Sequence, residues 1–132
     1  MKIANMEVSK YLDTGLKTMQ LATTNGGKPW VCTVWFVHDE SLNIFWLSLP
    51  SRRHSQHIKQ NSEVAVAIVI KPDDPTIGLQ IQGRAGVVTN PEIVKLVMAN
   101  YVQKYGQGNE FYNNLVAGTN KHQLYRLKPS EI

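Results

Sequence analysis

The sequence has 132 residues, a length that predicts a single domain spanning residues 1–132. Its composition, with 42% hydrophobic and 18% charged residues, excludes a disordered chain. Fourteen Lys and Arg residues against ten Asp and Glu give a formal charge of +4, which suits a phosphate-bearing ligand and is too small an excess to indicate nucleic-acid binding.

Cysteine content and hydropathy set further limits. Cys32 is the only cysteine, so the chain can form neither an internal disulfide nor a multi-cysteine zinc site. The first residues lack the continuous apolar core of a signal peptide. The longest apolar run, Val64–Ile70, is far shorter than a membrane span. We therefore expect a soluble cytoplasmic protein that does not associate with a membrane.

The N-terminal part is predicted to form a helix followed by a β-hairpin. Apolar residues recur at helical spacing between Val8 and Met19, at Val8, Tyr11, Leu12, Leu16 and Met19. Leu21–Thr24 and Trp30–Val37 have the composition of strands. Between them, Asn25-Gly26-Gly27 is expected to form the turn, because an Asn-Gly pair tolerates positive φ angles.

The next segment is predicted to add a strand and a short helix. A polar turn at His38–Ser41 leads into a strand at Asn43–Ser48. Because three strands then follow one another through short polar turns, we expect them to pair as an antiparallel meander. A helix is predicted over Arg52–Gln60, with Ser51 as its N-cap.

The middle of the chain is predicted to contain two longer strands. Val64–Ile70 is apolar at every position, which indicates a strand covered on both faces. After a loop at Lys71–Pro75, apolar and polar residues alternate over Ile77–Gln82, as expected for a half-buried strand. The pattern changes at Gly83, where we expect a bulge or a bend.

The C-terminal part is predicted to form a helix and a last strand. Asn90-Pro91 is a helix-start signal, and the apolar stripe that follows contains Ile93, Val94, Leu96, Val97 and Tyr101. A weaker helical pattern covers Asn109–Val116, and Leu124–Leu127 is predicted to be a strand that ends before Pro129. So many strands in so short a chain predict a mainly β fold, a small barrel with peripheral helices.

The segment from Ser48 to Ile58 carries the clearest chemical signal. A strand leads directly into a helix start that contains Ser51, Arg52, Arg53 and His54. Free backbone N–H groups at a helix start attract anions, and an arginine can add a bidentate contact to phosphate oxygens. The alternative is a basic, solvent-exposed helix face with an ordinary serine cap.

Further short segments accompany this one in a fixed order. They are Leu21-Ala-Thr-Thr24, Gly27-Lys-Pro29, Val31–Phe36, Ile44-Phe-Trp-Leu-Ser48, Ser51-Arg-Arg-His54, Val64-Ala-Val66 and Gln82-Gly-Arg-Ala85. The ordered set, which covers about Leu16 to Leu127, resembles the FMN-binding split β-barrel proteins of the pyridoxamine 5′-phosphate oxidase-like superfamily. Its most specific part is the Ser-Arg-Arg-His segment.

The resemblance implies a mainly β, antiparallel split barrel that forms a homodimer and binds FMN at the subunit interface. Arg53 and His54 match the basic pair that holds the flavin phosphate, and Ser51 belongs to the same turn. The matching strand positions beside the flavin ring include Cys32 and Thr33 on one strand and Leu47 and Ser48 on the next. Gln80, or its neighbour Gln82, is a further candidate for contact with the flavin from either subunit.

The sequence also departs from the vitamin-forming oxidase of that superfamily. The strand Val31–Phe36 lacks the Arg and Lys of the matching segment, and His54 replaces the second basic residue of the phosphate pair. We also expect no C-terminal substrate-binding extension after Pro129. These differences argue against oxidation of pyridoxamine phosphate and favour an FMN-dependent oxidoreductase that acts on another small organic substrate or electron acceptor.

Several alternatives stay open beside that hypothesis. One is a non-catalytic flavin carrier or sensor, and another is a haem-binding split barrel. His54 and His57 lack the placed carboxylate or thiolate of a typical metal site, so no metal is predicted. Cys32 is expected to be a buried inert thiol. The tryptophans are expected to fill the core or a dimer interface, and Lys and Arg do not gather beside them, which argues against nucleic acid.

Overall fold

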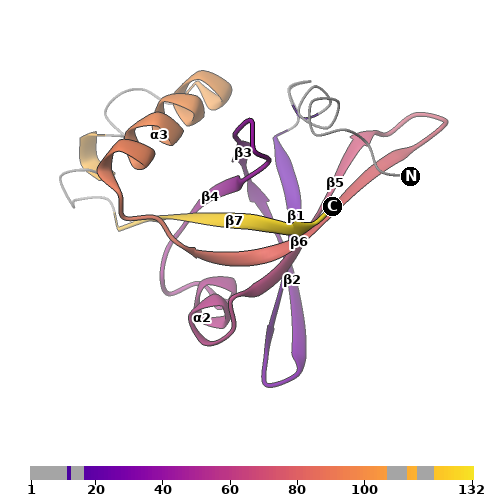
Figure 1. Cartoon of the computed structure of the whole chain (residues 1–132), viewed down its shortest axis with the longest axis horizontal. Coiled ribbons are helices and arrows are strands. Elements are labelled where there is room, and N and C mark those ends of the chain that lie inside the picture. Colours follow the sequence, from indigo (N-terminus) through magenta and orange to yellow (C-terminus); the bar gives the residue numbers. More distant parts are fainter. Residues whose placement is uncertain (1–11, 13–16, 107–112, 116–120) are drawn as a thin grey trace.

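The computed structural model describes residue 12 and residues 17–106, 113–115 and 121–132. Its main feature is a seven-stranded antiparallel sheet that curls into a half-barrel (Figure 1), so the predicted mainly β fold class is confirmed. The strands are β1 (Thr18–Asn25), β2 (Lys28–Trp35), β3 (Val37–His38), β4 (Ile44–Ser48), β5 (Glu63–Lys71), β6 (Ile77–Val87) and β7 (Gln123–Glu131). The helices are α2 (Arg53–Gln60) and α3 (Pro91–Tyr105).

The order of the strands shows where the barrel is split. It is β2-β1-β5-β6-β7-β4-β3, so β2 and β3, which follow each other in the chain, lie at opposite ends of the sheet. The expected three-stranded meander is correct at both turns, because β4 pairs antiparallel with β3. It is wrong in its middle strand: the predicted strand Trp30–Val37 breaks at Phe36, so β4 pairs with β3 and β7 and not with β2. Among the described residues, no strand ladder joins the two ends of the sheet.

The first hairpin forms where it was predicted. Strands β1 and β2 pair in register from Asn25 opposite Lys28 to Thr18 opposite Trp35. The two residues with positive φ are Gly26 (59°) and Gly27 (76°), so the turn is centred one residue after the Asn-Gly pair. Glycine adopts both conformations without a steric penalty, which explains why the hairpin turns at this point.

The crossing from one end of the sheet to the other takes place at Phe36. Its backbone N–H donates to the Tyr105 hydroxyl (2.9 Å), and its carbonyl accepts from the Lys104 ammonium (2.9 Å). That ammonium also lies 3.9 Å from the centre of the Phe36 ring, which is completely buried. The end of α3 therefore supplies the partners that this residue would otherwise find in a continuous β-ladder.

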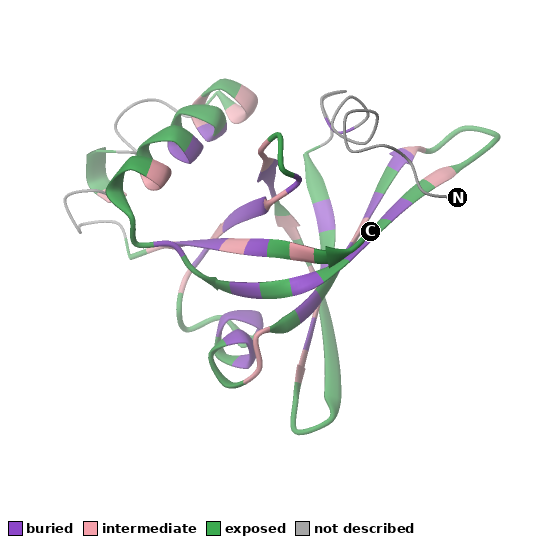
Figure 2. Cartoon of the chain, in the orientation of Figure 1, coloured by how far each residue is buried: buried purple, intermediate pink, exposed green. Residues whose placement is uncertain are grey.

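The core consists of two groups of buried side chains. The larger group lies inside the curled sheet, and the smaller one lies between α3 and strands β3, β4 and β7. Along β5 and β6, buried and exposed residues alternate (Figure 2). The expectation that Val64–Ile70 is covered on both faces is thus wrong for the single chain, because Val69 is 55% exposed.

The two helices differ in how they begin. In α3, the Asn90 side chain accepts hydrogen bonds from the N–H groups of Glu92 (3.0 Å) and Ile93 (3.3 Å), which confirms the predicted start. In α2, the N-cap is Arg52, and no side chain caps the helix. The predicted Ser51 cap is wrong, because the helix begins one residue later than a cap at that position requires.

Some predicted element boundaries lie outside the described residues or differ from the structure. Leu12 is helical and buried, but Lys17 is in no regular element and Thr18 and Met19 belong to β1, so the predicted first helix is wrong at its end. Its remaining residues lie outside the described ranges. Of the predicted helix at Asn109–Val116, only residues 113–115 are described, and they are helical. No helix in the described ranges is long and apolar enough to cross a membrane.

The hydrophobic stripe of α3 was predicted correctly only in part. Val97 and Tyr101 are buried as expected, and Ile93 and Val94 are half-buried. Leu96, however, is 73% exposed, and the neighbouring Met98 is buried in its place. The difference is one of helix phase, because the sheet covers a face slightly rotated from the one that the sequence pattern indicated.

The predicted bulge at Gly83 is confirmed. The register between β6 and β7 shifts between Gln82 and Gly83, and Gly83 lies opposite Pro129. The last strand therefore continues through Pro129, contrary to the prediction. Strand β4 pairs with β7 only as far as Leu127, so Pro129 lies where one edge of β7 has no strand partner and a missing N–H is tolerated.

Replacing Gly83 by alanine is expected to destabilise the fold. An added Cβ would lie 2.1 Å from the Lys128 carbonyl oxygen, so two backbones would have to move apart. The expected loss in the free energy of unfolding is about 1–3 kcal/mol, measured by urea denaturation. Gly86→Ala is the control, because an added Cβ there meets nothing within 4 Å. Equal stability of the two variants would contradict the role given to the close approach.

Candidate functional site

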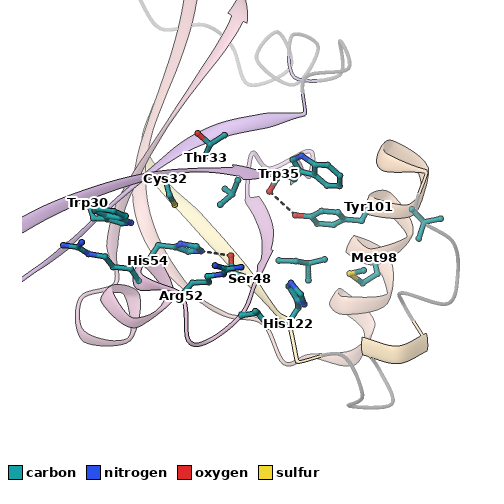
Figure 3. Close-up of a pocket in the computed structure, with 15 residues that line it drawn as sticks. Trp30, Cys32, Thr33, Trp35, Ser48, Arg52, His54, Met98, Tyr101 and His122 are labelled. Atoms are coloured by element: carbon teal, nitrogen blue, oxygen red, sulfur yellow. Dashed lines mark hydrogen bonds between the residues drawn. The ribbon is translucent and has the colours of Figure 1, made fainter.

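A cavity lies along the split of the barrel. It has a volume of about 610 Å³ and is bordered by β2, the end of β4, the start of α2 and the buried face of α3 (Figure 3). A cavity of this size is typical of sites that bind small molecules or cofactors. It exists because β2 and β4, which face each other across the split, do not pair.

The unpaired strand edges give this cavity backbone hydrogen-bonding groups. Strand β2 pairs with β1 on one side and, in the described ranges, with no strand on the other. Strand β4 pairs with β3 only at Ile44 and Phe45, so its last three residues have a free edge on that side. Free strand edges carry unsatisfied N–H and C=O groups, which can bind the polar rim of a flat ligand.

Two arginines at the start of α2 make one end of the cavity basic. Arg52 and Arg53 are both exposed, and both line the cavity. The only ion pair recorded within the described part of the chain is the exposed pair of Arg84 with Glu63 (3.9 Å), so neither arginine has a carboxylate partner there. The guanidinium of Arg53 lies over the Trp30 ring, 3.9 Å from its centre. This end of the cavity therefore suits an anion.

His54 is held differently from the two arginines. Its side chain is buried, and its Nε2 lies 2.6 Å from the Ser48 hydroxyl oxygen (Figure 3). Burial, together with the positive charge of Arg52, lowers the pKa of His54 below its ordinary value. His54 is thus a neutral hydrogen-bonding group at neutral pH, and the positive charge of this end comes from the arginines.

The opposite end of the cavity is closed by α3. Tyr101 is buried, and its hydroxyl lies 3.3 Å from the carbonyl oxygens of both Trp35 and Phe45. It therefore bridges the two strands that the split separates (Figure 3). Burial and the neighbouring Tyr105 raise the pKa of Tyr101, so its hydroxyl stays protonated and can donate to either carbonyl. Met98 and Val102 complete an apolar wall beside it.

Six of the eight residues predicted to bind a cofactor line this one cavity. They are Cys32, Thr33, Leu47, Ser48, Arg53 and His54. Ser51 and Gln80 do not belong to the lining of the cavity in the single chain. Ser51 is exposed in the turn before α2, and Gln80 is exposed on β6. Cys32 is half-buried, not buried as expected. This partial burial raises the pKa of its thiol, which fits the expected unreactive thiol.

Several lining residues were not predicted to bind a ligand. Arg52 lies within the recognised segment, but the sequence gives no sign of which arginine faces the cavity. Trp30 and Trp35 were assigned to the core or an interface, yet only Trp46 of the three tryptophans is fully buried. The α3 residues and His122 come from distant segments, and no local pattern connects them with the cavity. The described residues contain no group of three His, Cys, Asp or Glu side chains that could hold a metal.

Comparison with known proteins finds a matching family model. The family model described as pyridoxamine 5′-phosphate oxidase matches residues 7–132. No curated protein matches the chain.

Solved structures with the same fold include proteins of different descriptions. The heme storage protein HutZ from Vibrio cholerae is 22% identical over 100% of this chain and 93% of its own, with a TM-score of 0.73. A conserved hypothetical protein from Mycobacterium tuberculosis is 16% identical over 99% and 83%, with a TM-score of 0.81. An FAD-binding protein from Mesorhizobium loti is 17% identical over 98% and 91%, with a TM-score of 0.69. At these identities the similarity establishes the fold.

The burial of His54 predicts a pH-dependent loss of stability. The unfolded chain binds a proton near the ordinary pKa of 6.5, whereas the folded chain binds it only at a lower pH. The free energy of unfolding should therefore fall as the pH drops below 6.5, until the pKa of folded His54 has been passed. Urea denaturation across this range measures the effect. His54→Gln should reduce this part of the pH dependence, and an unchanged profile would contradict the assignment.

Proposed function

Because this chain belongs to the pyridoxamine 5′-phosphate oxidase family, we propose that its cavity binds FMN and that the protein is a flavin-dependent oxidoreductase. The observation that carries the proposal is the pair of arginines at one end of the cavity, for which the described residues offer no carboxylate partner, next to strand edges of β2 and β4 that no described strand covers. One end suits a phosphate, and the strand edges suit a flat ring with hydrogen-bonding groups on its rim.

The residues present fit such a cofactor in size and in chemistry. A volume of about 610 Å³ lies within the range of cofactor sites, which are mostly apolar with a few placed polar groups. Here the apolar and aromatic part consists of Trp30, Val34, Trp35, Leu47 and Met98, among others. The polar groups are concentrated at the start of α2, as binding of a terminal phosphate requires.

Each group has a role that follows from its position. Arg53 and Arg52 would bind the phosphate through charge-assisted hydrogen bonds, and Ser48 and His54 would add neutral ones. The backbone edge of β2 around Cys32 and Thr33 would bind the rim of the ring system. Tyr101 would close the far end, because its hydroxyl is already engaged with Trp35 and Phe45.

The enzymatic part of the proposal concerns a small organic substrate or electron acceptor. Bound FMN supplies the redox chemistry, and the protein binds it, orients it and restricts access to it. A non-catalytic flavin carrier or sensor is the alternative. Steady-state turnover with reduced nicotinamide and a panel of small acceptors distinguishes the two, because a carrier would bind FMN without turnover.

Haem is a second candidate ligand for the same cavity. His122 lines the cavity and carries the imidazole that a haem iron commonly requires. A solved protein with this fold is described as a heme storage protein. The two arginines do not distinguish the two ligands, because they could pair with the propionates of haem as well as with a phosphate. FMN is favoured because the chain belongs to the pyridoxamine 5′-phosphate oxidase family.

Arg53→Ala is expected to weaken FMN binding. Removing one charge-assisted contact should cost about 1.5–3 kcal/mol, or roughly a ten- to hundredfold increase in the dissociation constant. Fluorescence titration with FMN measures it. Arg84→Ala is the matched control, because Arg84 is an exposed arginine paired with Glu63 and is not among the cavity-lining residues. Unchanged affinity in Arg53→Ala would remove the phosphate site from this end of the cavity.

We also propose that two chains form a homodimer through the outer face of β2, β1 and β5. That face carries Val31 and Val69, which are 59% and 55% exposed, and the small residues Ala22, Ala65 and Ala67 between them. Ala22 lies opposite both Val31 and Ala65, so the apolar surface is continuous across the strands. Strand β2 also lines the cavity, so a second copy on this face would border the flavin site.

Introducing a charge at the centre of this face should separate the dimer. Ala65→Arg would place a long, charged side chain where the two copies would meet, and burying that charge in the contact is costly. Sedimentation equilibrium should then show a dimer for the wild-type protein and a monomer for the variant. Leu96→Arg is the control, because Leu96 is exposed on α3 away from this face. A monomeric wild-type protein, or equal dimerisation of both variants, would contradict the proposal.

A further inference from the structure

Trp30 and Arg53 form a pair whose geometry bears on ligand selection. The two residues come from different elements, Trp30 from β2 and Arg53 from the first turn of α2. The guanidinium carbon lies 3.9 Å from the centre of the Trp30 ring, well within the range of an attractive cation–π contact. Both residues line the cavity, at its basic end.

Stacking leaves the hydrogen-bond donors of Arg53 available. A guanidinium is planar, and its five N–H bonds lie in that plane. An aromatic ring that covers one face of the plane occupies none of these donors. A carboxylate partner would instead use two of them and neutralise the charge, and none is recorded for Arg53 within the described ranges.

Stacking also restricts the freedom of the side chain. Arg53 is exposed, and an exposed arginine loses considerable rotamer entropy when a ligand fixes it. Trp30 is 37% exposed and belongs to a strand, so its ring is a comparatively rigid support. An arginine already held against this ring loses less entropy on binding, which strengthens each hydrogen bond to the ligand.

We infer that Trp30 is a positioning residue that holds Arg53 for the ligand phosphate and thereby makes the site select phosphorylated over unphosphorylated flavin. The inference rests on the proposed function, since it concerns the same site. FMN and riboflavin differ only in the phosphate group, so the ratio of their dissociation constants measures this selection directly.

The test compares the binding of FMN and riboflavin by the full-length protein and its Trp30 variants. Trp30→Leu should weaken FMN binding about three- to tenfold more than riboflavin binding, because it removes the cation–π contact. Trp30→Phe, which keeps a smaller aromatic ring, should restore most of the selection. In an Arg53→Met background, Trp30→Leu should no longer change the ratio, since the two side chains act as one unit.

Trp35→Leu is the matched control. Trp35 also comes from β2 and lines the cavity, but it stacks on Tyr105 (4.5 Å) and not on an arginine. Its replacement should leave the ratio of the two dissociation constants unchanged.

Different outcomes separate the failure of this inference from the failure of the proposed function. If both Trp30 variants lose FMN and riboflavin binding to the same extent, the inference about phosphate selection is overturned, but the proposed binding of FMN by the wild-type protein is not. The same holds if both variants bind both compounds as well as the wild-type protein does, with an unchanged ratio of the two dissociation constants. A wild-type protein that binds neither compound would overturn the proposed function as well.

Discussion

The separation of β2 from β4 is the constraint on which the rest of the structure depends. The chain leaves one end of the sheet after Trp35 and joins the opposite end at Val37, so β2 and β4 do not satisfy each other's backbone groups. Three side chains of α3 hold this break: Lys104 and Tyr105 bind the Phe36 backbone, and Tyr101 bridges the carbonyls of Trp35 and Phe45. Without that helix, the Phe36 backbone and the carbonyls of Trp35 and Phe45 would lose these hydrogen-bond partners.

The space between the unpaired strands β2 and β4 forms a cavity whose two ends differ chemically. One end is closed by apolar and aromatic side chains of α3, and the other carries two arginines with no carboxylate partner among the described residues. His54, between them and the strand, is neutral, because burial lowers its pKa. A ligand that joins an anionic group to a flat, partly apolar ring matches this gradient better than a uniformly charged or uniformly apolar one.

The features that the sequence predicted correctly are those with local causes. Gly26-Gly27, Asn90-Pro91 and Gly83 each act on their own stretch of backbone, and the structure places a turn, a helix start and a bulge there. The errors concern contacts between distant segments. The pairing of β4 with β7 and the contribution of Tyr101 to the cavity leave no trace in local periodicity. The sequence also did not indicate that Arg52 lines the cavity beside Arg53, because two adjacent basic residues look alike without a structure.

The central claim is that the cavity holds FMN, and the visible absorption spectrum tests it most directly. The purified protein would be incubated with FMN, passed through a desalting column and scanned. The account predicts that the flavin bands remain with the protein, at close to one flavin per chain. A colourless protein would contradict it, and a Soret band that appears only after addition of haem would assign the cavity to haem instead.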